Sequence, residues 1–309
     1  MDPSRRFSRL LAALDDPDLR ARRAAEAFST LPAEEAVSLL GGLVRLADRR
    51  SDPASAALEG ALRAVRMLLS VADKDRLRKA AEALSEHEVL ALLSAAASAR
   101  SFDVDREQYV DREMRARTLG QRKQLARKPN RDLIARLATD QDPSVLRHLL
   151  ENPRTTEREV LVAASRRPAR GSVLEEIFRS RRWQVNRRVR KALALNPYSP
   201  PALSSAALAL LTVPDLREVA ADSHLAAEVR IQARRFIASR SGRPEDALAS
   251  VQVSRFVAAQ LVSAQARSTA LASDEAGDPA SREPASGEPA REEPTETPAG
   301  PTDRGEEAT

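Results

Sequence analysis

The chain contains no cysteine among its 309 residues. This absence excludes disulfide bonds, thiolate ligands for a metal and a cysteine nucleophile. The three histidines, His87, His148 and His224, do not have a spacing typical of metal ligands or of a catalytic set, and no glycine-rich loop that would cradle a phosphate is present. We therefore expect a protein that is not an enzyme and that has no cofactor and no bound metal.

Aromatic residues are also scarce, at 3% of the chain, and glycine occurs only 10 times. No stretch shows the alternating pattern, rich in Val, Ile and Thr, that is typical of β-strands. Ala, Leu, Arg and Glu, which favour helices, are abundant instead. The composition therefore predicts an all-α protein.

Long hydrophobic runs are missing as well. The longest early run, Leu10–Leu14, is followed at once by Asp15 and Asp16. Such a run is too short for a secretory signal or for a helix that crosses a membrane. We expect a soluble, cytoplasmic protein that has no membrane partner.

Helices separated by short breaks are predicted for most of the chain before residue 273. Leu58, Leu62, Val65 and Leu69 recur at intervals of three and four, as on the buried face of a helix. An Asp-Pro pair at Asp16 is typical of a helix start. Further starts are predicted by four pairs with the spacing of a capping box, Ser85 with Glu88, Thr118 with Gln121, Thr156 with Glu159, and Ser172 with Glu175.

Two segments in the middle of the chain repeat each other. "VLRHLLENP" (145–153) and "VRKALALNP" (189–197) share Val, a basic residue, Leu and Asn-Pro at matching positions, 44 residues apart. A weaker copy, "VRIQARRFI", begins 40 residues later at Val229. A period near 40 residues that is built from helices predicts an α-solenoid of HEAT-like helical repeats.

These motifs resemble two known groups of repeat proteins. "DDPDLRARRAAEAF" and "DQDPSVLRHLL" look like the Asp-Pro-x-x-Arg pattern of HEAT repeats. "LATDQDPSVLRHLLENPRTTEREVL" and "LALNPYSPPAL" resemble the leucine-rich-repeat variant, whose shorter helical units have an Asn-Pro-x-Thr-x-x-x-Val turn. The resemblance covers residues 119–239 and, more loosely, residues 10–98. It implies an α-solenoid. Some leucine-rich-repeat-variant proteins are associated with an iron–sulfur cluster bound by cysteine, a feature that this cysteine-free chain does not share.

These patterns divide the chain into five predicted parts. The first three are HEAT-like helical repeats over residues 1–98, a polar connecting segment over 99–118 and variant helical repeats over 119–240. They are followed by a C-terminal amphipathic helix over 241–272 and a disordered acidic tail rich in Pro and Glu over 273–309. The amphipathic helix is expected to cap the hydrophobic end of the solenoid, or else to dock in the groove of a partner. The tail has too few large apolar residues to offset the entropy of ordering.

Charge is unevenly distributed along the chain, whose net charge is +5. Residues 101–240 carry 28 basic and 17 acidic side chains, whereas residues 241–309 carry 6 and 13. Such a split is typical of contact with nucleic acid, or of a tail that screens a basic body. Because 45 of the 50 basic residues are arginine, the codon bias of a GC-rich genome explains the arginine excess equally well.

The densest group of basic residues lies in "RSRRWQVNRRVRKALALNP" (179–197), which also contains the only tryptophan. On a helical wheel an apolar stripe begins at Val185 and ends at Leu193. Trp183 falls outside this stripe and is expected to pack at the entry of the helix. The candidate partner-binding residues are Arg181, Arg182, Trp183, Arg187, Arg190 and Lys191. The last three of these lie on the solvated face of the predicted helix.

Two functions fit these residues. The first is a non-enzymatic scaffold that binds a protein partner bearing an acidic patch. The alternative is a nucleic-acid-binding, HEAT-like solenoid that uses the basic ridge over 166–191, where an exposed Trp183 would stack on a base. DNA-alkylation-repair glycosylases are HEAT-like solenoids whose basic cleft contains aromatics and an aspartate, but residues 166–191 have one tryptophan and no aspartate, which argues against that activity.

Overall fold

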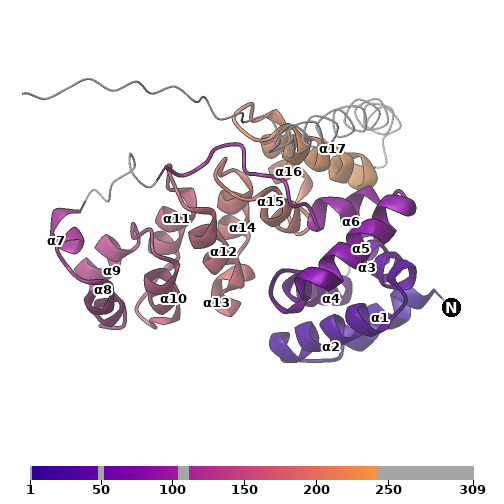
Figure 1. Ribbon diagram of the computed structural model, residues 1–309, viewed down its shortest axis with the longest axis horizontal. Helices are drawn as coiled ribbons and strands as arrows, with labels where there is room; N and C mark the ends of the chain where they lie inside the picture. Colours follow the sequence, from indigo (N-terminus) through magenta and orange to yellow (C-terminus); the bar gives the residue numbers. More distant parts are fainter. Residues whose placement is uncertain (1, 48–51, 104–110, 242–309) are drawn as a thin grey trace, which may run out of the picture. The chain divides into compact units, whose positions relative to one another are not determined.

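The computed structural model describes residues 2–47, 52–103 and 111–241, and no β-strand occurs among them (Figure 1). The N-terminal helices are α1 (Pro3–Ala12), α2 (Pro17–Thr30), α3 (Ala33–Ala47), α4 (Asp52–Arg63), the π-helix η1 (Ala64–Leu68), α5 (Val71–Ala83) and α6 (His87–Leu92). The later helices are α7 (Arg112–Arg115), α8 (Leu119–Ala126), α9 (Arg131–Leu137), α10 (Pro143–Glu151), α11 (Glu157–Ser165), α12 (Gly171–Arg179), α13 (Arg181–Gln184), α14 (Arg187–Ala194), α15 (Pro201–Leu208), α16 (Val213–Ala221) and α17 (Ala227–Ser241). The predicted all-α class is confirmed. The predicted amphipathic helix and acidic tail, apart from Ser241, lie outside the described residues.

Several helices begin where the capping signals predict. Asp16 accepts a hydrogen bond from the backbone N–H of Asp18 at 2.9 Å, and a proline follows it in the first turn of α2. Thr118 forms a reciprocal capping box at the start of α8, and Thr156 forms one at the start of α11. In each box a side chain satisfies a backbone donor that has no partner inside the helix.

The other two predicted capping boxes are wrong. α12 begins at Gly171, so Ser172 lies inside the first turn and Glu175 pairs with a residue of another helix. Ser85 has a positive φ of 54° and follows α5 instead of capping α6, whose N-cap is Glu86. The backbone N–H of Glu86 donates to the carbonyl oxygen of Ala81, as in a helix C-terminus that ends in a left-handed residue.

One connected cluster of buried apolar side chains includes residues from α1 through to α17. Within it α6 packs against α15 and also contacts α17, so that the N-terminal helices meet the later ones (Figure 1). The segment that follows α6 continues this contact, because the N–H of Arg100 donates to the carbonyl oxygen of Pro197 at 3.1 Å. The junction between the two groups of helices is therefore partly apolar.

The two repeated segments end in the same kind of turn. In both copies the amide nitrogen of the asparagine donates to two backbone carbonyls. Asn152 Nδ2 bonds Ala126 O and Lys128 O at 2.8 and 3.0 Å, and Asn196 Nδ2 bonds Ala164 O and Arg166 O at 2.8 and 3.0 Å. Each asparagine thus ties the end of its own helix to the end of an earlier one.

A hydroxyl group three residues after each asparagine completes the match. Thr155 Oγ1 donates to Leu149 O at 2.6 Å, and Ser199 Oγ donates to Leu193 O at 2.7 Å. Both asparagines are buried, with at most 3% of their surface exposed. The correspondence over 44 residues in the sequence is therefore also a correspondence in hydrogen bonding.

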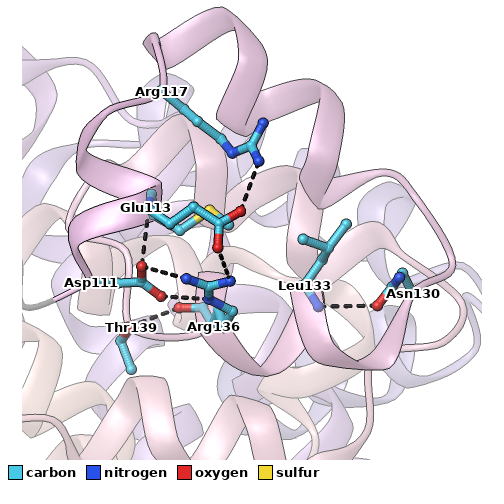
Figure 2. Close-up of polar contacts among 8 residues, drawn as sticks. Asp111, Glu113, Arg117, Asn130, Leu133, Arg136 and Thr139 are labelled. Carbon is cyan, nitrogen blue, oxygen red and sulfur yellow. Dashed lines mark hydrogen bonds and ion pairs between the residues drawn. The ribbon is translucent and has the colours of Figure 1, made fainter.

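A cluster of ion pairs ties the start of α7 to α9 (Figure 2). Arg136 binds the carboxylate of Asp111 through two hydrogen bonds, of 2.6 and 2.7 Å, and also pairs with Glu113. The hydrogen bonds from Arg136 outweigh the effect of burial and lower the pKa of Asp111 to about 2. Because this pKa is lowered, the stabilisation from Asp111 is complete above its usual value of about 4 and is lost as the pH falls towards 2.

Replacing either turn asparagine removes two hydrogen bonds from buried carbonyls. We expect Asn152→Ala and Asn196→Ala each to lower the free energy of unfolding by about 2–3 kcal/mol. Asn130→Ala, which removes only an exposed N-cap of α9, should lower it by about 1 kcal/mol. Urea denaturation followed by circular dichroism measures all three variants. Losses at Asn152 and Asn196 no larger than at Asn130 would show that the two turns are not structural anchors.

Candidate partner-binding surface

Trp183 lies on α13 and is buried, with 5% of its surface exposed. Its indole N–H donates to the carbonyl oxygen of Leu150 at 3.1 Å, and the guanidinium carbon of Arg182 lies 4.5 Å from the ring centroid. The indole thus fixes α13 against the last turn of α10. A base can stack only on an exposed ring, so that part of the nucleic-acid interpretation is wrong.

Arg181 and Arg190 reach the N-terminal helices. Arg181 pairs with Asp16 at 2.8 Å and with Asp18 at 2.9 Å, at the start of α2. Arg190 is only 7% exposed and pairs with Glu59 on α4. The predicted solvated position of Arg190 is wrong, because the side chain of Glu59 lies against this side of α14. A helical wheel of α14 alone does not reveal a neighbour from another part of the chain.

Arginines of α4 and η1 make contacts in the opposite direction. Arg63 donates to the carbonyl oxygen of Arg179 at 2.7 Å and pairs with Asp18 at 2.8 Å. Arg66 pairs with Glu175 on α12. We use the term arginine clamp for the four arginines that link the two groups of helices, Arg63, Arg66, Arg181 and Arg190.

Arg187 and Lys191 are paired within the later group of helices. Arg187 lies 2.7 Å from Asp215, and Lys191 lies 3.5 Å from Asp215 and 2.6 Å from Glu218. Burial opposes the ionisation of Asp215, but the hydrogen bonds from Arg187 and Thr212 and the two nearby cations lower its pKa. The positive charge on this side of α14 is therefore largely neutralised inside the protein.

Arg182 differs from the other charged candidates, because it has no carboxylate partner among the described residues. It is exposed, and its guanidinium donates to the carbonyl oxygens of Asn152 at 3.2 Å and of Thr155 at 3.0 Å. These carbonyls belong to the turn that Asn152 anchors. Of the six candidates, Arg182 is thus the cation whose charge is least balanced by the rest of the molecule.

Two further exposed cations lie beside the same turn. The carbonyl oxygen of Lys128 accepts a bond from Asn152 Nδ2, and the N–H of Arg154 donates to Asn152 Oδ1 at 3.0 Å. In the part of the chain that the structure describes, neither side chain pairs with a carboxylate. We refer to Lys128, Arg154 and Arg182 as the Asn152 cations. They were not among the sequence candidates, apart from Arg182.

An open groove lies between α11 and α14. It is lined by apolar atoms of Leu161 and Val162, and Val162 is 44% exposed. Arg158 and Arg188 border it; Arg188 pairs with Glu157 at 3.3 Å, whereas Arg158 has no carboxylate partner among the residues described. A partner that entered this groove would meet an apolar surface beside positive charge.

The three histidines lie in different places. His87 begins α6, His148 on α10 lies 3.0 Å from Arg127, and His224 lies 3.1 Å from Asp222. Over the described ranges, no group of three or more His, Asp or Glu side chains is arranged to hold a metal ion. No helix in those ranges is long and apolar enough to cross a membrane.

Sequence reasoning missed the charged residues that complete the arginine clamp on α4 and η1. Glu59, Arg63 and Arg66 are the only charged residues between positions 54 and 69. Their spacing of four and three places them on one side of a helix. A charged stripe on an otherwise apolar helix is thus the feature of the sequence that indicates ion pairs between this helix and other helices of the same chain.

Comparison of the chain with protein-family models, with curated proteins and with solved structures finds no match. The contacts described above are therefore the basis for any functional assignment.

The clamp can be tested with two arginines of α14 that differ in burial. Arg190→Gln leaves the Glu59 carboxylate without its partner, and we expect it to lower the free energy of unfolding by about 2–3 kcal/mol. Arg188→Gln changes a side chain that is 78% exposed and should cost less than about 0.5 kcal/mol. Urea denaturation measures both. Equal losses would contradict a special role for Arg190.

Proposed function

We propose that the protein is a non-enzymatic helical-repeat scaffold that binds a protein partner. The observation that carries this proposal is the matched pair of turns at Asn152 and Asn196, which make the same hydrogen bonds 44 residues apart. Helices around these turns pack on near neighbours, α8 on α10, α10 on α12 and α14 on α15. Stacking of similar units on their neighbours is typical of helical-repeat proteins, which commonly present extended binding surfaces.

The chemistry of the partner follows from the charges that remain unbalanced. Lys128, Arg154 and Arg182 are exposed around one turn, and the described residues supply none of them with a carboxylate. An acidic patch on the partner would supply the missing negative charge and would direct the encounter. The binding surface that we propose is therefore centred on the Asn152 cations.

The other sequence candidates have a supporting part in this proposal. Arg181 and Arg190 join α13 and α14 to the N-terminal helices, and Arg187 and Lys191 join α14 to α16. Trp183 holds Arg182 in place by stacking. These residues would position the surface, and Arg182 would contact the partner directly.

A nucleic-acid-binding scaffold is the second candidate, because phosphates would also satisfy the Asn152 cations. With the indole of Trp183 buried, binding would depend on phosphate contacts alone. Such contacts depend strongly on salt, since each neutralised phosphate releases condensed counterions.

The test is affinity capture from native lysate with the tagged full-length chain, with and without nuclease. A charge-reversed variant, Lys128→Glu/Arg154→Glu, removes two of the Asn152 cations. A matched control, Arg22→Glu/Lys79→Glu, changes two exposed cations on α2 and α5. We expect specific proteins to be retained after nuclease treatment by the wild type and by the control, and to be lost from the charge-reversed variant.

Two results would contradict the protein-binding proposal. If all captured material disappears on nuclease treatment, the partner is a nucleic acid and the second candidate is favoured. If the charge-reversed variant retains the same proteins as the control, the Asn152 cations are not the binding surface. Circular dichroism on each variant checks that a loss of binding does not reflect unfolding.

A further inference from the structure

Two arginines from two groups of helices pair with one carboxylate, and a lysine lies within range of their charges. Arg66 on η1 pairs with Glu175 on α12, and Arg179 at the end of α12 lies 3.7 Å from the same carboxylate. Lys74 on α5 lies close enough for the charges of Arg66, Arg179 and Glu175 to act on it. A single carboxylate cannot neutralise three positive charges.

The neighbouring carboxylate does not remove this imbalance. Glu176 is 6% exposed, accepts two hydrogen bonds from Arg147 at 2.9 and 3.0 Å, and accepts one from Arg179 at 3.0 Å. The cluster therefore combines four cations, Arg66, Lys74, Arg147 and Arg179, with two carboxylates, Glu175 and Glu176. Its positive charge exceeds its negative charge by two.

Lys74 shows the effect of this excess. It has no ion-pair partner among the described residues and is partly buried. Burial and then repulsion from Arg66 lower the pKa of Lys74, and the attraction of Glu175 does not offset them. An added negative charge close to Lys74 would therefore be stabilising.

The cluster also contains unused hydrogen-bond donors. The Nε atoms of Arg66 and Arg179 are buried, and neither has an acceptor among the residues that the structure describes. Buried donors in folded proteins usually have a partner. Arg66 lies on a π-helix, a rare element that occurs frequently at functional sites. Excess positive charge and unused donors together indicate a place for an anion.

We propose that Arg66, Lys74 and Arg179 form a binding site for a phosphate group, either free phosphate or a phosphomonoester. Near neutral pH a phosphate group carries a charge close to −2 and has several acceptor oxygens, which matches the charge excess and the free donors. Guanidinium groups bind phosphate through charge-assisted hydrogen bonds. The bound anion would bridge α5 and η1 to α12, and would thereby strengthen the junction that the arginine clamp forms. The site is independent of the scaffold function.

The test titrates the full-length chain with inorganic phosphate and, in a second arm, with O-phosphoserine, at an ionic strength held constant with sodium chloride. Isothermal titration calorimetry measures affinity, and thermal unfolding measures stabilisation. We expect Lys74→Gln to weaken binding by about tenfold or more, since it removes a charge-assisted contact. Lys79→Gln, on the same helix but exposed, should leave the affinity unchanged.

A second readout concerns the chain without phosphate. Lys74→Gln removes a repelled charge, so its unfolding temperature should equal or exceed that of the wild type, whereas Arg66→Gln should be less stable. Tighter binding of O-phosphoserine than of phosphate would assign the site to a phosphomonoester, and equal binding would assign it to free phosphate.

The proposal is overturned if phosphate produces neither binding heat nor a thermal shift beyond that of chloride. It is also overturned if Lys74→Gln binds phosphate as tightly as the wild type. Neither result would affect the capture experiment on the Asn152 cations, so failure of the phosphate site can be distinguished from failure of the scaffold proposal.

Discussion

The ion pairs and hydrogen bonds of the arginine clamp are the interactions on which the arrangement of the two helix groups depends. Arg181 and Arg190 extend from α13 and α14 to carboxylates of α2 and α4, and Arg63 and Arg66 extend the other way. Arginine suits this role because its long side chain ends in a planar fork that can bind two acceptors at once. Breaking a buried pair leaves one charge without a partner, which costs more than the pair contributes when it is intact. We therefore expect the buried pairs of the clamp to specify the geometry of the junction more than they stabilise it, while the apolar contact of α6 with α15 supplies burial.

The clamp also determines which arginines are available to bind a partner or an anion. A basic segment that is read along the sequence suggests one continuous positive surface, but most of its charges are neutralised by carboxylates from other helices. Among the cations that carboxylates do not balance, two groups support a proposal, one around the Asn152 turn and one around Glu175. The first is exposed and suits an acidic partner, whereas the second is partly buried, has unused donors and suits a compact anion. Local charge balance, rather than the density of arginine, is therefore the basis for both proposals.

The features that the sequence predicts well are those that depend on neighbouring residues. The helical class, the capping boxes at Thr118 and Thr156 and the similarity of the two Asn-Pro turns follow from composition and short-range spacing. The environments of Trp183 and Arg190 could not be predicted in full, because they are set by Leu150 and Glu59, which lie far away in the sequence. The capping box expected at Ser172 is wrong because α12 begins one residue earlier, at Gly171, and Glu175 pairs with the distant Arg66. A single sequence gives little indication of long-range ion pairs. Here the only indication is the charged stripe on α4 and η1.

The central claim, that the clamp holds α2 and α4 against α13 and α14, can be tested by a distance measurement in solution. Because the chain has no cysteine, spin labels attached through Leu19→Cys and Val185→Cys would be the only labels present. Both positions are exposed, at 50% and 55%, and they lie near the ion pair between Asp18 and Arg181. Pulsed electron paramagnetic resonance should give one short, narrow distance distribution, which broadens when Arg181→Gln and Arg190→Gln are added. A long or broad distribution in the chain that retains both arginines would contradict the account.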